Sequence, residues 1–241
     1  MRRLYLTLIS LSWTCSSLAF QRALFPFKLQ TSSVKLASSD HDGDEEVRYN
    51  SIAISGFISK ENNFVEPFVL SKLFKTGKWS DMTTLTDDVK FARKRLMSPD
   101  IVNSGLTNVL KFAEVDKSDS SLENALAGKE AWLCFNVTST ELPIYAAVAA
   151  KVGLKRAIFA VNVSPDDSGA GVTFDAAASI LATAKIAYTI IKYGPVRKMG
   201  EAKYPYRIAR GESALPTEGR DMLASDDLMR VSMEALLTIA L

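Results

Sequence analysis

The amino-acid sequence predicts an α/β fold with a doubly wound, mostly parallel sheet and flanking helices. Three short apolar runs carry this prediction: Leu110–Val115, Ala131–Val137 and Ala157–Val163. Each run is bounded by turn or charged residues, which is typical of strands buried on both faces. Segments with helix signals separate the runs, and this alternation indicates parallel strands joined by crossover helices. Such sheets bind ligands outside the carboxyl ends of their strands.

The first 48 residues have the composition of targeting segments. Arg2 and Arg3 precede an apolar core at Leu4–Trp13 that is too short for a stable membrane anchor. Residues 21–39 contain no acid, as is typical of a transit peptide. The junction before Phe20 resembles that of bipartite presequences in algae with secondary plastids. We therefore expect a signal peptide over residues 1–20, a transit peptide and acidic linker over 21–48, and plastid localisation. An ordinary secretory signal followed by a basic linker is the alternative.

Charge and length limit what the remaining chain can be. The 241 residues carry a formal net charge of +2, but residues 1–39 contribute five basic residues and no acid. Their removal leaves 24 basic and 27 acidic residues, a net charge of −3. The length of residues 49–241 suits a single domain. Its net charge does not suit a general nucleic-acid binder, and a local basic patch is the alternative. We expect no transmembrane segment in the mature chain.

Cysteine and histidine usage excludes several catalytic classes. Cys134 lies in the middle of an apolar run, so we expect a buried structural thiol rather than a nucleophile. His41 is the only histidine and lies in the acidic linker. The sequence therefore predicts neither a histidine-based triad nor a histidine metal site.

Capping residues and turn signals place the other elements. Further strands are expected at Asn50–Gly56, Val89–Lys94 and Ala187–Tyr193. Helices are expected over Phe64–Lys75, Leu122–Ala127, from Ser139 or Thr140 to Gly153, Thr173–Lys185, and from Ser225 onward. The segments Lys78–Asp88, Ser98–Asn108 and Pro165–Gly171 are expected to be loops.

Three motifs resemble the NmrA-like group of atypical short-chain dehydrogenase/reductases. Val115–Gly128 resembles its Asp followed by a Ser-Leu-x-x-Ala-Leu-x-Gly helix, and Ala187–Lys192 resembles its Tyr-Thr-Ile-Ile strand. Leu223–Leu236 resembles its closing helix. The resemblance covers residues 50 to 240, about four fifths of the chain, in order. It implies an NAD(P)-binding Rossmann-type domain over residues 49–241.

The cofactor loop departs from the pattern of that family. The resemblance places a Gly-x-x-Gly-x-x-Gly turn after the first strand, where glycines bring the backbone close to the pyrophosphate. Between Ser55 and Asn63 only Gly56 remains. Phe57 and Ile58 replace small residues, and Glu61 adds a negative charge. Either the loop is remodelled or the dinucleotide is lost, and the sequence favours loss or severe weakening.

The resemblance also implies cofactor-binding residues at the strand ends, namely Gly56, Arg93, Asp116, Asn136, Thr138 and Ser164. Arg93 would pair with a 2′-phosphate and so favour NADP over NAD; the alternative is a solvated Arg in a basic run. Asp116 would lie near the adenine, or else cap the turn before a helix. Asn136, Thr138 and Ser164 would line the cofactor.

A catalytic dyad is harder to place. The wider superfamily uses Tyr-x-x-x-Lys, in which the lysine lowers the pKa of the tyrosine. Tyr188 and Lys192 have this spacing, but in a strand they would be about 13 Å apart. The dyad belongs on a helix, and the helix at Thr173–Lys185 offers Phe174 and Ala178 at the plausible spacing. Phenylalanine cannot donate a proton.

Two function hypotheses follow. The first is a non-catalytic or weakly nucleotide-binding plastid module that binds a protein partner. The second is an NADP-dependent oxidoreductase with an unrecognised proton donor such as Tyr145 or Tyr193.

Overall fold

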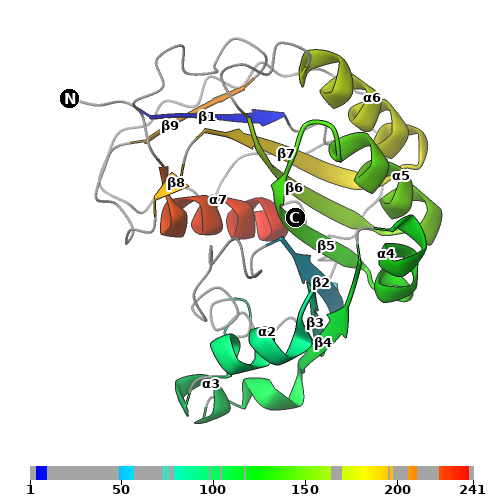
Figure 1. The fold of residues 1–241 in the computed structure, drawn as a ribbon. Coiled ribbons are helices and arrows are strands. Elements are labelled where there is room, and N and C mark those ends of the chain that lie inside the picture. Colours follow the sequence, from blue (N-terminus) through cyan, green and yellow to red (C-terminus); the bar gives the residue numbers. More distant parts are fainter. Residues whose placement is uncertain are drawn as a thin grey trace, which may run out of the picture.

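An eight-stranded sheet organises the computed structural model (Figure 1). The structure describes residues 4–9, 49–56, 73, 75, 79–97, 99–103, 105–116, 118–163, 170–194, 196–197, 206–210 and 223–238. The strand order is β4-β3-β2-β5-β6-β7-β1-β9, and a separate pair joins β10 (Leu223–Ala224) to β8 (Val196–Arg197).

The six central strands are all parallel to their neighbours. They are β2 (Ser51–Ser55), β3 (Asp81–Thr86), β4 (Leu110–Glu114), β5 (Ala131–Val137), β6 (Arg156–Asn162) and β7 (Ala187–Tyr193). Counted in chain order, their arrangement in the sheet is 3-2-1-4-5-6, the order of the Rossmann fold. The predicted fold class is therefore confirmed.

The second parallel strand is not where the sequence placed it. The prediction of a strand at Val89–Lys94 is wrong, because this segment belongs to helix α2 (Val89–Leu96). The strand is β3, inside the segment expected to be the loop Lys78–Asp88. Its buried threonines are β-branched and suit a strand, although their hydroxyls gave the segment a polar composition. Asp88 then begins α2, since its side chain accepts a hydrogen bond from the Phe91 amide at 2.9 Å.

Helices cover both faces of the sheet (Figure 1). On one face lie α2 and α7 (Ser225–Thr238). On the other lie α4 (Asp119–Leu126), α5 (Leu142–Val152) and α6 (Ala170–Thr183). The expected loop Ser98–Asn108 instead contains α3 (Pro99–Asn103) and a 3₁₀ turn, Leu106–Asn108. Most of the expected helix Phe64–Lys75 and most of the expected loop Pro165–Gly171 lie outside the described residues.

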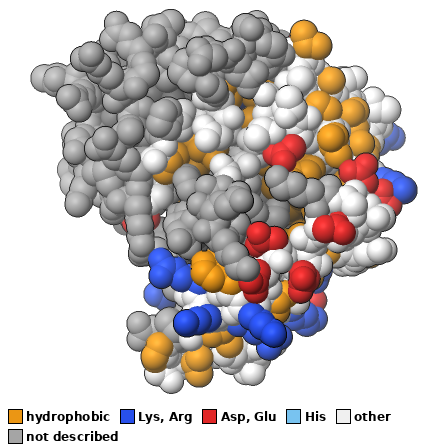
Figure 2. Space-filling model, viewed as in Figure 1, with side chains coloured by type: hydrophobic (Ala, Val, Ile, Leu, Met, Phe, Trp, Pro, Cys, Tyr) orange, Lys and Arg blue, Asp and Glu red, His pale blue; other side chains and the backbone are white. Residues whose placement is uncertain are grey.

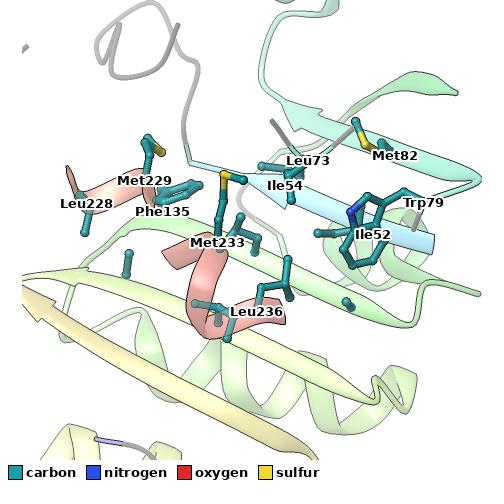
Figure 3. Close-up of a cluster of buried hydrophobic side chains, with 14 of the residues drawn as sticks. Ile52, Ile54, Leu73, Trp79, Met82, Phe135, Leu228, Met229, Met233 and Leu236 are labelled. Atoms are coloured by element: carbon teal, nitrogen blue, oxygen red, sulfur yellow. The ribbon is translucent and has the colours of Figure 1, made fainter. Parts of the chain in front are cut away.

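The closing helix α7 forms much of the core on its face (Figure 3). Met229, Met233 and Leu236 are buried on α7 and belong to the same cluster as Ile54 and Phe135 of the sheet. Full burial of a side chain of this size contributes about 1.5–3 kcal/mol, so these contacts fix α7 on the sheet. Ser225 begins the helix, as the sequence predicts.

The segment expected to be a signal peptide contributes a strand in the full chain. β1 (Leu4–Ile9) pairs antiparallel with β7 and parallel with β9 (Tyr206–Arg210). Removal of residues 1–20 would take this strand away, so the paired β1 and the processed chain are alternative states. None of the described helices is long and apolar enough to cross a membrane.

Candidate functional site

The site predicted by the fold is the edge where β2 and β5 end. These two strands are neighbours in the sheet, and the strand order reverses between them. Open parallel sheets bind ligands at this switch point, outside the carboxyl ends of the strands. Gly56 follows β2 here, and Asn136 and Thr138 lie at the end of β5. The structure thus brings three of the predicted site residues to one edge.

A bulge shapes the end of β5. The register with β6 shifts between Cys134 and Val137, and Asn136 adopts a left-handed backbone with φ of 55°. Gly56 has φ of 71°, and a Cβ built on it would lie 1.7 Å from the carbonyl oxygen of Phe135. The one glycine that remains from the cofactor motif is therefore required by packing between β2 and β5.

A buried polar trio lies directly beneath this edge. The Ser55 hydroxyl accepts a hydrogen bond from Trp132 Nε1 at 2.8 Å and donates one to Cys134 Sγ at 3.0 Å. Cys134 is 1% exposed, and burial raises its pKa to about 12, although the Ser55 hydrogen bond acts in the opposite direction. The prediction of a buried Cys134 is confirmed, and a neutral thiol of this kind is a poor nucleophile.

Thr138 and Glu141 form hydrogen bonds with each other in both directions. Its amide and its hydroxyl donate to Glu141 Oε2 at 3.0 and 2.8 Å, and its Oγ1 accepts from the Glu141 amide at 3.2 Å. This reciprocal pattern is a capping box before α5. The Glu141 carboxylate therefore adds a negative charge at the start of α5, beside the end of β5.

Asp116 also caps a turn. It accepts hydrogen bonds from the Ser118 amide at 2.9 Å and from the Ser118 hydroxyl, and its own amide donates to Ser121 Oγ at 3.2 Å. These Ser118 hydrogen bonds lower the pKa of the Asp116 carboxyl. The arrangement matches the turn alternative for Asp116, and it leads directly into α4.

Arg93 is not at the end of the second strand. It lies in α2, and its guanidinium carbon is 5.5 Å from the centroid of the Phe112 ring. The second strand ends at Thr86, and the exposed Asp87 follows it. In a Rossmann domain an acidic residue at this end binds the ribose 2′-hydroxyl of NAD and disfavours the 2′-phosphate of NADP. Sequence reasoning missed Asp87 because it placed the strand too late; the Asp88 cap would have marked the boundary. Ser164 lies outside the described residues.

The positions expected for the catalytic dyad hold no tyrosine–lysine pair. Tyr188 and Lys192 lie on β7, as predicted, so strand geometry separates them. Phe174 of α6 is 2% exposed, and Lys192 Nζ lies 3.9 Å from the centroid of its ring. The lysine therefore contacts an aromatic face that carries no exchangeable proton.

The two alternative proton donors lie on opposite faces of the sheet. Tyr145 of α5 packs on Trp132, with ring centroids 5.4 Å apart. Tyr193 ends β7 in the cluster on the α7 face and is 1% exposed. Burial raises the pKa of both phenols, so neither is poised to lose a proton near neutral pH. The described residues contain no group of three metal-ligating side chains.

No protein-family model and no curated protein matches the chain. Solved structures do match. The NADPH-dependent quinone oxidoreductase of Escherichia coli is 19% identical with a TM-score of 0.38, and the match covers 57% of this chain and 45% of that one. Triphenylmethane reductase from Citrobacter sp. is 20% identical with a TM-score of 0.39, covering 57% and 47%.

A third structure matches more of the chain. The Bordetella bronchiseptica enzyme WbmH, in complex with NAD⁺, is 10% identical with a TM-score of 0.45, covering 78% of this chain and 71% of that one. The matches to the first two reductases span less than half of their length. Each of these is a similarity in fold at 20% identity or less.

Proposed function

We propose that the chain is a plastid binding protein built on a Rossmann domain, which holds dinucleotides weakly and does not catalyse hydride transfer. The observation that carries the proposal is the contact of Lys192 Nζ with the ring of Phe174 at 3.9 Å. A reductase of this type needs a phenol whose proton is activated by the lysine. On α6, where that phenol is expected, this chain has Phe174, and the ring that Lys192 contacts has no proton to donate.

The polar groups at the cofactor edge add support. Thr138 and Asp116 are bonded within their own turns, so binding a dinucleotide through them would break existing hydrogen bonds. The Glu141 carboxylate adds negative charge to an edge that would have to hold a pyrophosphate. Charge-assisted hydrogen bonds contribute about 1.5–3 kcal/mol each, so losing two changes a micromolar affinity into a millimolar one.

Thermal unfolding with cofactors tests the proposal. We expect about 1 mM NADPH or NADH to raise the Tm of the full chain by no more than about 1 °C, because ligand at its Kd adds only about 0.4 kcal/mol. ADP-ribose, which lacks the nicotinamide, serves as a control for binding by the adenosine half alone. A rise of several degrees with either dinucleotide would contradict weak binding.

A second candidate is an NAD-dependent oxidoreductase with Tyr145 or Tyr193 as proton donor. Asp87 favours it, because an acid after the second strand suits a ribose with a free 2′-hydroxyl. This reading replaces the preference for NADP that was assigned to Arg93. If NADH raises the Tm by several degrees, Asp87→Ser should remove that effect, whereas Asp119→Ser on the neighbouring helix should retain it. That pair of results would favour the oxidoreductase.

A further inference from the structure

The helix α2 carries a dense set of exposed cations. Half of its eight residues are basic, all four are exposed, and the helix contains no acid. These residues are Lys90, Arg93, Lys94 and Arg95, and together they form what we term the α2 basic face. None of the four forms an ion pair with any residue that the structure describes.

Some other lysines of the described residues are paired with carboxylates. Four of them lie 2.5 to 2.9 Å from a carboxylate oxygen, on Asp81, Glu123 or Glu130. These paired lysines are Lys111, Lys129, Lys151 and Lys155. Arg93, Lys94 and Arg95 lie in the last turn of α2, where the helix dipole favours cations, so this cluster is compatible with a stable helix while its charge faces solvent.

The α2 basic face lies at one end of the molecule, beside the edge strand β4 (Figure 1). Figure 2 shows basic side chains gathered over this end, with apolar side chains below them and acidic side chains on the side facing the rest of the molecule. Val102 of α3 is 49% exposed, one of the few large apolar side chains of the described residues left in water. Cations next to an exposed aliphatic group match a surface that is anionic outside and apolar beneath.

We propose that the α2 basic face, together with Val102, docks on the headgroups of an anionic lipid bilayer. Each lysine or arginine held near such a surface strengthens binding about fivefold, so four cations suffice for reversible attachment. This contact needs no membrane span, and it uses none of the residues on which the weak-binding proposal rests. The proposal therefore stands or fails independently of the proposed function.

The aromatic side chains at this end favour lipid over nucleic acid. Binding of single strands relies on aromatic faces that are free to stack on bases. Phe91 and Phe112 are partly buried against the core, and Arg93 covers the ring of Phe112 at 5.5 Å. Only the cations of this surface are free to contact a ligand, and they suit anionic lipid headgroups better than nucleic-acid bases.

Vesicle co-sedimentation of the full chain tests the proposal. The vesicles contain phosphatidylcholine alone or with roughly 30% phosphatidylglycerol, at salt concentrations from about 50 to 500 mM. We expect binding to the anionic vesicles only, weakened by salt. Lys90→Gln with Lys94→Gln should weaken it about 25-fold, and Lys94→Gln alone about fivefold. Both side chains are exposed, so circular dichroism should show an unchanged Tm.

The matched control is Lys151→Gln with Lys185→Gln, which removes the same charge from α5 and from the turn after α6. It should change vesicle affinity less than twofold. Because Arg2 and Arg3 remain in every variant, the comparison isolates α2. Equal weakening by both double variants, or no binding to anionic vesicles, overturns the proposal. So does tighter binding to a single-stranded uridine oligonucleotide that depends on Lys90 and Lys94.

Discussion

The backbone of Phe135 occupies the space that a side chain at Gly56 would need: a Cβ there would lie 1.7 Å from the Phe135 carbonyl oxygen. The clash involves the main chain of a central strand, which cannot move aside without disturbing β5. Gly56 also has φ of 71°, where side chains are strained by about 1–2 kcal/mol. The glycine is thus fixed by the fold itself, whether or not a dinucleotide binds.

We expect Gly56→Ala to destabilise the protein by at least about 3 kcal/mol, because backbone strain and a main-chain clash add together. Urea unfolding measures the loss. Gly128→Ala is the matched control, since Gly128 has nearly the same φ, 74°, and open space around it. It should cost only about 1–2 kcal/mol. If the two variants lose the same stability, the contact with Phe135 does not constrain Gly56.

Cys134 should be inert in the native protein. Its pKa is raised to about 12 by burial, so the thiolate fraction near pH 8 is negligible. In a Cys15→Ser background, alkylation should be slow in buffer and fast in about 6 M urea. Ser55→Ala should leave the native rate low, because burial and not the hydroxyl sets the pKa. Rapid alkylation without denaturant would reveal an accessible thiol.

Most of the sheet could be predicted because its central strands are apolar on both faces. Ala131–Val137 is a run of this kind, and its bounds are the same in sequence and structure. β3 could not be found in this way, because Thr83, Thr84 and Thr86 are buried while their hydroxyls read as polar. Burial of a threonine depends on the partner strand, which a single sequence does not show.

The candidate site could be predicted less well than the fold. Gly56, Asn136 and Thr138 do meet at one edge, since strand ends follow from the strands. Arg93 was misplaced because the second strand was expected at Val89–Lys94, eight residues later than β3 (Asp81–Thr86). The contact between Phe174 and Lys192 joins α6 to β7, and no sequence spacing predicts it. Interactions between elements, rather than within them, account for what was missed.

The ionisation of Glu130 should make the free energy of unfolding depend on pH in the acidic range. Lys155 lies 2.5 Å from Glu130 Oε1, and the Asn50 amide donates to Oε2; together these contacts lower the carboxyl pKa below its usual 4.5. The folded state therefore binds fewer protons than the unfolded state between the two pKa values. The stabilisation is complete above about pH 4.5 and is lost as the pH falls through the folded-state pKa.

We expect Glu130→Gln to be less stable than the wild type at neutral pH. The gap in unfolding free energy between the two proteins should narrow below about pH 4.5. Urea unfolding over a pH series from about 7 to 3 measures this gap. In a Lys155→Met background the gap should be smaller and less dependent on pH, because the main partner of the carboxylate is gone. A gap that stays constant down to pH 3 would show that the contacts do not favour the ionised form.

Cleavage of the N-terminal segment would determine whether β1 belongs to the sheet of the mature protein. In the full chain, Thr7 pairs with Lys192 and Leu8 with Ile191, so β1 lies between β7 and β9. A presequence cleaved before Phe20 would remove β1 and leave that side of β7 without this partner. Because an unpaired strand edge is open to other chains, the processed protein would have to close it with another segment or a partner.

We expect a fluorescent protein fused to residues 1–40 to enter the plastid of an alga with a secondary plastid, and Phe20→Ala to divert it. The reason is an apolar core followed by a segment with basic residues and no acid. A fusion of residues 21–40 alone, which lacks the apolar core, should stay in the cytosol. Mass spectrometry of the full-length protein from the same cells should find no peptide from Leu4–Ile9. Secretion of the unmutated fusion, or a mature chain that retains Leu4–Ile9, would contradict the presequence and make β1 a permanent strand of the sheet.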